Sequence, residues 1–433
     1  ISETYARFRL STGGGLLPTG FVNNGEVEDY MLSLRPAPSD VYVDAAFSGT
    51  PGTVIPDADP AVDGAQPGTL GADAFATIQQ AINVVAPGGR VHVANGTYGE
   101  ALSIGKSLSL LGQSAAGVVL QGAGSGTGLN VSAPIVSISN LTAQNFATGL
   151  SAVNMTSLNL TDVRENGNTS AGAVTKVVTV NFTGADTAET YTVNGTRFGR
   201  ADALLSYSGV TNLNVSALGG ADVITVNGTA SGTALQVDTG AGDDVIEIEA
   251  PSARLGNMLG GPVTVNAGAG TNKLRVSEAN CSAGDVITIL PTQILGEGPF
   301  PFTINYSATG GSFANGIYVD TGWSDDWIRI RGTPAAPLTV STSTGDEHID
   351  IDAPSGRLGN VLGGPVSIDA GPGVNQLHIS EANCSAGDVI TVLPTQIIGE
   401  GPFPFTINYS ATGGSFAGGF DLTTGYSDDW VRV

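Results

Sequence analysis

Short runs in which apolar and polar residues alternate extend along most of this chain. After residue 176 they follow one another at short, regular spacing, as in "DVITVNG", "ALQVDTG" and "DVIEIEA", with Gly, Asn, Asp or Thr between them. Alternation with a period of two is typical of a strand with one buried face, and the intervening residues are typical of turns. The pattern therefore predicts an all-β chain.

The regular spacing allows two architectures for residues 176–433, a continuous solenoid or a series of small β-sandwiches. No linker and no change of composition separates this region from the strands before it. We therefore expect a β-solenoid that continues the preceding part of the chain, with each turn packed on the next.

One long passage occurs twice almost unchanged. The string that begins "SEANCSAGDVIT" at Ser277 returns at Ser380, and the two cysteines give an offset of 384 − 281 = 103 residues. This predicts tandem repeats at about 227–329 and 330–433. Because each layer of a repeat structure is stabilised by its neighbours, copying a unit lengthens the structure without a new core.

A single amphipathic segment stands out near the start. In "FATIQQAINVV" the apolar residues Phe75, Ile78, Ala81, Ile82 and Val85 share one helical face, and "PGG" follows. We predict a helix near residues 75–85 that covers the exposed end of a stack of strands.

Residues 73–125 carry the order "FATIQQAI", "PGGRVHVANGTYGE" and "IGKSLSLLG". This order resembles the N-terminal capping helix and first strands of pectin-lyase-like right-handed parallel β-helices. The resemblance implies that residues 37–175 form such a β-helix, capped by the predicted helix.

The resemblance does not extend to the chemistry of that family. The esterase strings "YQDTL" and "DFIFGNA" are absent, and the few charged residues in the corresponding region are Asp162, Arg164 and Glu165. An Asp–Arg pair is more often a surface salt bridge than a catalytic site, and a fold does not determine a function. We therefore assign no catalytic residue and expect that the chain is not an enzyme.

The first 36 residues differ from the rest. "YARFRLS" and "GEVEDY", from Gly25 to Tyr30, resemble the C-terminal end of the bacterial GEVED domain. The resemblance implies two strands of a β-sandwich-type domain whose remainder lies upstream, in a longer polypeptide. Within it Glu26, Glu28 and Asp29 are candidates for contact with a cation or a partner, and the alternative is a solvated strand face. "RPAPSD" then predicts a stiff linker.

The charge composition of the chain limits the kinds of partner that it can bind. The net charge is −23, with only 16 Lys and Arg residues, so nucleic acid and anionic membranes are excluded as partners. No apolar run is long enough to insert into a membrane, and two cysteines give no disulfide framework. We expect an extracellular or cell-surface protein, for which calcium is the natural counter-ion.

Several predicted turns combine Gly with acidic residues, as in "TGAGDDVIEIE" and "TGWSDDWIRI". They are similar to the Gly/Asp turns of calcium-binding secreted repeats, and this implies calcium as the one possible cofactor. The alternative is that Asp and Gly simply form soluble turns. The candidate ligands are Asp222, Asp243, Asp244, Asp325, Asp326, Asp346, Asp428 and Asp429.

Aromatic residues near these turns and in the "GEGPFPF" segments are candidates for interaction with sugars, with a neighbouring chain or with a strand edge. Prolines cannot take part in a strand ladder, so each "GEGPFPF" is predicted to be a loop or bulge. The candidate residues are Phe300, Phe302, Trp323, Trp327, Phe403, Phe405, Tyr426 and Trp430.

Taken together, the sequence favours a non-catalytic structural segment of a large bacterial surface or fibre protein, acting as a scaffold, stalk or adhesin. Its expected partners are other copies of itself or adjoining domains of the same chain, and surface glycans. Two alternatives stay open. One is a carbohydrate-binding or carbohydrate-active β-helix, which requires carboxylates and an Arg converging on one lateral face, and the other is a calcium-dependent adhesive module.

Overall fold

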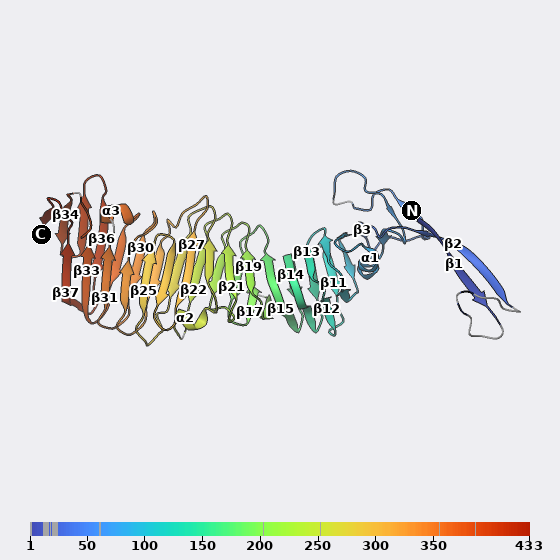
Figure 1. The fold of residues 1–433 in the computed structure, drawn as a ribbon, viewed down its shortest axis with the longest axis horizontal. Coiled ribbons are helices and arrows are strands. Elements are labelled where there is room, and N and C mark those ends of the chain that lie inside the picture. The colour runs from blue at the N-terminus through green and yellow to red at the C-terminus, as the bar shows by residue number, and fades with distance from the viewer. Residues whose placement is uncertain are drawn as a thin grey trace.

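The computed structural model is all-β and elongated, with short strands following one another along its length (Figure 1). It describes residues 2–11, 17, 19, 25–59, 62–201, 203–251, 253–354, 356–385 and 387–433. Most strands belong to one large, mostly parallel sheet, and their pairings arrange them in columns.

Column 1 begins beside the only long helix of the described residues and reaches the far end of the molecule. Within most strands buried and more accessible positions alternate, as in "VITV" of β20, because one face packs on the core. In order, column 1 contains β3 (Asp40–Val43), β7 (Arg90–Val93), β10 (Leu108–Gly112), the first half of β13 (Ile135–Gln144), the middle of β14 (Thr148–Asn166), the second half of β15 (Ser170–Thr183), β19 (Asn212–Ser216), β21 (Ala234–Asp238), β23 (Val263–Asn266), β27 (Phe302–Ser307), β26 (Gln293–Glu297), β25 (Val286–Leu290), β29 (Trp327–Ile330), β31 (His348–Asp352), β33 (Val374–Ser380) and β37 (Ser415–Thr423).

Column 2 takes the strands that alternate with these along the chain. In order, it contains β9 (Leu102–Ile104), β12 (Thr127–Val131), the first parts of β14 and β15, β18 (Ala203–Ser208), β17 (Arg197–Arg200), β16 (Thr190–Val193), β20 (Val223–Val226), β22 (Val245–Glu249), β24 (Lys273–Ser277), β28 (Ile317–Asp320), β30 (Leu338–Ser341), β32 (Val366–Asp369), β36 (Phe405–Ser410), β35 (Gln396–Glu400), β34 (Val389–Leu393) and β38 (Trp430–Arg432).

A third, shorter column lies only in the first part of the sheet. It contains β8 (Gly96–Tyr98), β11 (Val118–Gln121) and the last residues of β13 and β14. Among the described residues no strand pairs with the last segment of β14 on its other side. The sheet therefore changes from three columns to two near residue 184.

In three places the chain folds back on itself as a three-stranded antiparallel meander: β16–β17–β18, β25–β26–β27 and β34–β35–β36. In the second of these, β27 pairs with the earlier strand β23, and β25 pairs with the later strand β29. Each meander places three strands in its column where a single strand would otherwise stand, so that column gains two strands. The three meanders fall in columns 2, 1 and 2, so the two additional strands are added alternately to one column and to the other.

The two copies of the repeated passage consequently lie on opposite columns. Strand β22 of the first copy is in column 2, and its equivalent β31, 103 residues later, is in column 1. The short helices α2 (Leu255–Met258) and α3 (Leu358–Val361) show the same exchange, because they lie at opposite edges of the molecule (Figure 1). Equivalent residues of the two copies therefore face opposite sides.

A tyrosine hydroxyl holds each meander together. Tyr207, Tyr306 and Tyr409 donate to the carbonyl oxygens of Asn194, Leu290 and Leu393 at 2.8, 2.5 and 2.6 Å. Each bond links the last strand of a meander to the end of its first strand.

Replacement of Tyr306 by Phe is expected to lower the free energy of unfolding by about 1 kcal/mol, because the partly buried Leu290 carbonyl loses its donor. Chemical denaturation of Tyr306→Phe measures the change. Tyr426→Phe is the control, since Tyr426 is 81% exposed. Equal stability of Tyr306→Phe and the unmodified chain would contradict this role.

One hydrophobic core runs through the columns, from Val41 and Val43 at one end to Ile407 near the other. Helix α1 (Ile78–Val84) lies within the predicted range and packs Ile78, Ala81 and Ile82 on β3, β7 and β9. The carboxylate of Glu100 accepts hydrogen bonds from the first amides of α1, which satisfies donors that a helix end leaves open.

Two small sheets lie outside the columns. Strands β1 (Ser2–Leu10) and β2 (Glu26–Leu34) form an antiparallel pair, in agreement with the two strands expected there. Strands β4 (Val54–Ile55) and β5 (Gly68–Thr69) form another, within the loop before α1, and β6 (Ala74–Phe75) pairs with β3.

Candidate functional site

The acidic turns predicted to bind calcium each connect a strand of one column to the next strand along the chain, which lies in the other column. In the doublets that begin at Asp243, Asp325 and Asp346 the first acid accepts a backbone hydrogen bond from a segment further along the chain, as Asp243 does from Thr271 at 2.8 Å. The second acid accepts one from an earlier segment, as Asp244 does from Asp222 at 2.9 Å. The same arrangement recurs in the copies at Asp325, Asp326 and Asp346, with Glu347, and Asp429 accepts a bond from the Asp388 amide. The doublets therefore fasten each layer to the layers on both sides.

The two acids of a doublet differ in exposure. Asp222, Asp244, Asp326 and Glu347 are almost fully buried, whereas Asp243, Asp325, Asp346 and Asp428 are at the surface or partly exposed. Burial raises the pKa of Asp222 and of Asp326 to about 6, and that of Glu347 to about 7, with neighbouring carboxylates adding to the rise. Backbone hydrogen bonds oppose these shifts without cancelling them.

No group of three or more His, Cys, Asp or Glu side chains in the described part of the chain is arranged to hold a metal ion. Doublet acids use one oxygen for a backbone amide, and the inner acids are buried. Calcium binding at these turns stays a prediction.

The predicted interaction residues are not gathered in one patch. Trp327 donates from Nε1 to Asp350 at 2.6 Å, and the Arg329 guanidinium lies 3.8 Å from its ring centroid. Arg432 lies in the same way 4.4 Å from the ring of Trp430. Trp323 and Tyr426 are also exposed, and they lie in different turns, between β28 and β29 and between β37 and β38.

The "GEGPFPF" segments pack against the body of the molecule. Phe300 and Phe403 are exposed at the loop tips, under the guanidinium groups of Arg254 and Arg357. Phe302 and Phe405 are buried in the core, which leaves only the tip residues accessible to a partner. Cys281 and Cys384 are both buried and form no disulfide.

The acids of the N-terminal strand pair are exposed. Asp29 accepts two hydrogen bonds of 2.7 Å from the guanidinium of Arg7, its neighbour across the pair, and Tyr30 donates to Glu28. Asp29 and Glu28 are therefore engaged within this pair, and Glu26 lies at the start of β2.

A groove of about 560 Å³ lies where the third column ends. Arg164, Glu165 and Asn166 from β14 form one side, and Glu189 and Arg200 from the first meander form the other. It brings carboxylates and arginines together on one lateral face, which the sequence left as the condition for carbohydrate recognition.

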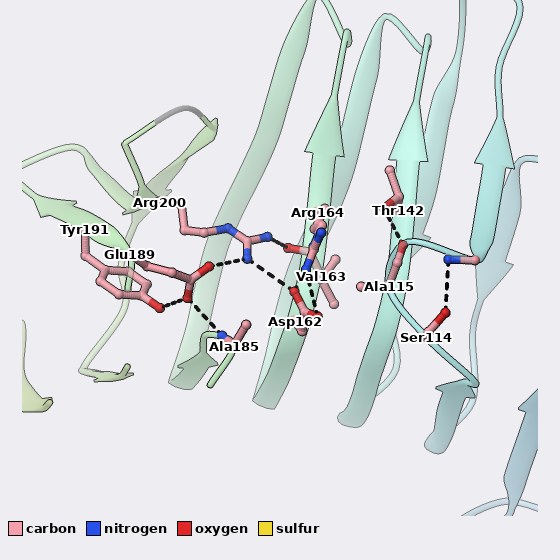
Figure 2. A network of polar contacts seen from close by, with 11 residues as sticks. Ser114, Ala115, Thr142, Asp162, Val163, Arg164, Ala185, Glu189, Tyr191 and Arg200 are labelled. Carbon is pink, nitrogen blue, oxygen red and sulfur yellow. Dashed lines mark hydrogen bonds and ion pairs between the residues drawn. The ribbon is translucent and has the colours of Figure 1, made fainter. Parts of the chain in front are cut away.

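A network centred on Arg200 crosses this groove (Figure 2). Its Nη1 donates to Glu189 at 2.8 Å and to Asp162 at 3.2 Å, and its Nη2 donates to the carbonyl of Val163 at 3.1 Å. Arg164 also donates hydrogen bonds to the Asp162 carboxylate, from Nε at 2.9 Å and from Nη2 at 3.2 Å. Arg200 therefore satisfies an edge carbonyl that no neighbouring strand pairs with.

The environment sets the protonation of these acids. Burial alone would raise the pKa of Asp162, but hydrogen bonds and charge from Arg164 and Arg200 outweigh it and hold this pKa below its usual range. For Glu165 nothing comparable offsets burial, and its pKa rises to about 9 although Asn168 donates to it at 2.7 Å. Glu165 is thus uncharged at neutral pH, while Asp162 is ionised.

Replacement of Arg200 by Met is expected to lower the free energy of unfolding by about 2 kcal/mol, since Asp162 and Glu189 lose a charged donor in a largely buried place. Thermal or chemical unfolding measures the loss. Arg197→Met, on the exposed end of the same strand, is the matched control. Equal destabilisation by the two variants would show that the network contributes little.

Asp162, Arg164 and Glu165 were recognisable in the sequence as a charged group, whereas Glu189 and Arg200 were not. The latter two join the group only because the first meander folds back over the end of the third column. A possible signal was "RFGRAD", whose two arginines are conspicuous in a chain with so few basic residues.

No helix of the described residues is long and apolar enough to cross a membrane. Comparisons with protein-family models, with curated proteins and with solved structures found nothing that matches this chain.

Proposed function

We propose that the columns are the faces of a right-handed parallel β-solenoid capped by α1, and that this solenoid is a non-catalytic structural segment. Parallel pairing at every step outside the meanders, alternating burial and the helix over the first strands all support this fold. The β-helix-like and GEVED-like sequence stretches support its origin in a large bacterial surface protein.

The observation that carries the proposal is the unbroken core. Buried residues extend from Val41 to Ile407 with no linker between separate globules, and acidic doublets fasten successive layers. Such a body resists bending and stretching because each layer is bonded to both neighbours. It suits a scaffold, a stalk or the shaft of an adhesin outside the cell, where its charge of −23 keeps it soluble.

Electron microscopy of the purified chain tests this role directly. Residues 227–329 hold nine strands, β21 to β29, shared between two columns, so a second copy of these residues inserted after residue 329 should lengthen the particle by roughly 20–25 Å, at ~4.8 Å per strand. Separate beads joined by flexible hinges would contradict the solenoid. Release of fragments from a polysaccharide would contradict the non-catalytic assignment.

Calcium fits this proposal at the outer acids. Asp325 and Asp346 lie in successive layers and are linked by the Asp346 amide, so an ion between them would strengthen the stack. Melting temperatures with calcium and with a chelator measure the effect, because a ligand of the folded state raises the transition. Equal transitions would remove calcium from the proposal, and other copies of the chain would remain the expected partner.

A further inference from the structure

The groove beside β14 is a product of the change from three columns to two. The last residues of β14 pair with β13 on one side, as Thr142 does with Arg164, and with no strand on the other side among the described residues. The first meander follows this edge along the molecule, and the guanidinium of Arg200 donates a hydrogen bond to the carbonyl of Val163 at the edge. The result is a step in the surface with a fixed floor and wall.

The surface of the step is polar without being strongly charged. Thr142 and Gln144 are held by hydrogen bonds to Ala115 and Gln121, at 2.6 and 2.7 Å, so their orientation is set before any ligand arrives. Val119 and Ala188 supply small apolar areas of the groove lining. A ligand with hydroxyl groups and C–H faces finds a complement for both.

The ionised groups of the step cancel one another. Arg164 and Arg200 carry two positive charges, and Asp162 and Glu189 two negative ones, joined in one chain of ion pairs from Arg164 through Asp162 and Arg200 to Glu189. The rest of the chain is strongly acidic, with a total of −23. An anionic ligand therefore meets repulsion from the whole molecule and no surplus positive charge at the step.

Glu165 provides an unused polar atom at the base. Its Oε2 accepts from Asn168, whereas its buried Oε1 has no hydrogen-bond partner among the described residues. Its side chain lies against Gly149, where a Cβ would fall 1.5 Å from Oε2. Because burial keeps this carboxyl protonated up to about pH 9, it can donate as well as accept.

We propose that this groove binds an uncharged, polyhydroxylated ligand of the oligosaccharide class, using Glu165, Arg164 and Gln144 as its polar contacts. The groove volume of about 560 Å³ is in the range of small-molecule sites. The site adds a recognition role to the shaft and does not depend on the scaffold function.

Titration of the full chain with cellohexaose, maltohexaose and hexagalacturonate tests the proposal, with binding followed by calorimetry. At least one of the two neutral hexamers should bind, and hexagalacturonate should bind about tenfold more weakly or not at all. Binding of hexagalacturonate as tight as that of the neutral sugars would overturn the proposal, and so would the absence of any binding.

Variants locate the binding. Glu165→Leu should weaken it about tenfold, because a donor and acceptor are lost, while Glu165→Gln should retain it. Ala188→Trp, at an exposed wall position, should block the groove without touching the core, and Ala173→Trp, exposed on β15, is its matched control. Unchanged affinity in folded Ala188→Trp would place the ligand elsewhere and overturn the assignment.

Discussion

Raising the pH from about 4.5 to about 8 is expected to lower the free energy of unfolding by on the order of 5 kcal/mol. The groups responsible include the buried turn acids Asp222, Asp326 and Glu347, together with Glu278, which accepts from the Leu255 amide. Burial raises the pKa values of these four carboxyls to about 6 or about 7. Glu165, whose pKa rises to about 9, adds a further loss of stability over the same pH range.

The sign follows from proton binding. In the unfolded chain these carboxyls release their protons near pH 4, whereas the folded chain holds them to about pH 6 or 7. Between these values the folded state binds more protons, so stability is full below the lower limit and falls as pH rises through the upper one. Each shift corresponds to roughly 3 kcal/mol, and coupling between neighbours makes the total smaller than the sum.

At lower pH, stability depends on carboxyls whose pKa is lowered in the folded state. The Arg90 guanidinium lowers the pKa of Asp40 to about 2, so its contribution is lost only in strong acid. Maximum stability is therefore expected near pH 4–5.

Denaturant unfolding at a series of pH values measures this profile. The variant Asp222→Asn with Glu347→Gln should flatten it, since these amides cannot ionise. Glu247→Gln, on the outward side of β22, is the control that should leave the slope unchanged. A free energy of unfolding that is constant between about pH 5 and 8 would refute the assignment.

Replacement of Gly242 by Ala is expected to cost 4 kcal/mol or more, enough to unfold part of the stack. At this corner the backbone φ is 151°, and a Cβ would lie 1.7 Å from the carbonyl oxygen of Gly220 in the neighbouring layer. The clash is with backbone, which cannot move without breaking the bonds that Asp222 and Asp244 make there.

Gly105→Ala is the matched control, because it introduces the same methyl group where nothing lies within 4 Å. Melting temperatures of the two variants and of the unmodified chain make the comparison. Equal melting of Gly242→Ala and Gly105→Ala would mean that the layers at this corner are further apart than the structure shows.

The strands and the helix could be predicted from the sequence, but the exchange of the two copies between the columns could not. Strands, helix α1 and the N-terminal strand pair follow from local periodicity, because each buries one face. The meanders could not be foreseen, since "DVITIL", "TQILGE" and "FTINYS" all read as ordinary strands and nothing local shows that β26 runs against its neighbours. Direction of pairing is set by the loops and by distant strands.

The acidic turns were found but their contacts were not. An Asp doublet after Gly looks the same in sequence whether it faces an ion or the amide of the next layer, as Asp243 does. The groove was harder still, because Arg200 meets Asp162 and Val163 from a different part of the fold. Only Asp162, Arg164 and Glu165, which are close along the chain, were visible together.

Because the two copies lie on exchanged columns, the number of copies determines more than the length of the molecule. It also determines on which side the parts that follow are placed. One additional copy would carry everything that follows it to the far flank of the molecule, whereas a pair of additional copies would bring it back. Odd and even arrays would thus display the same downstream parts in opposite directions, and recombination between the near-identical passages could reverse their aim in a single event.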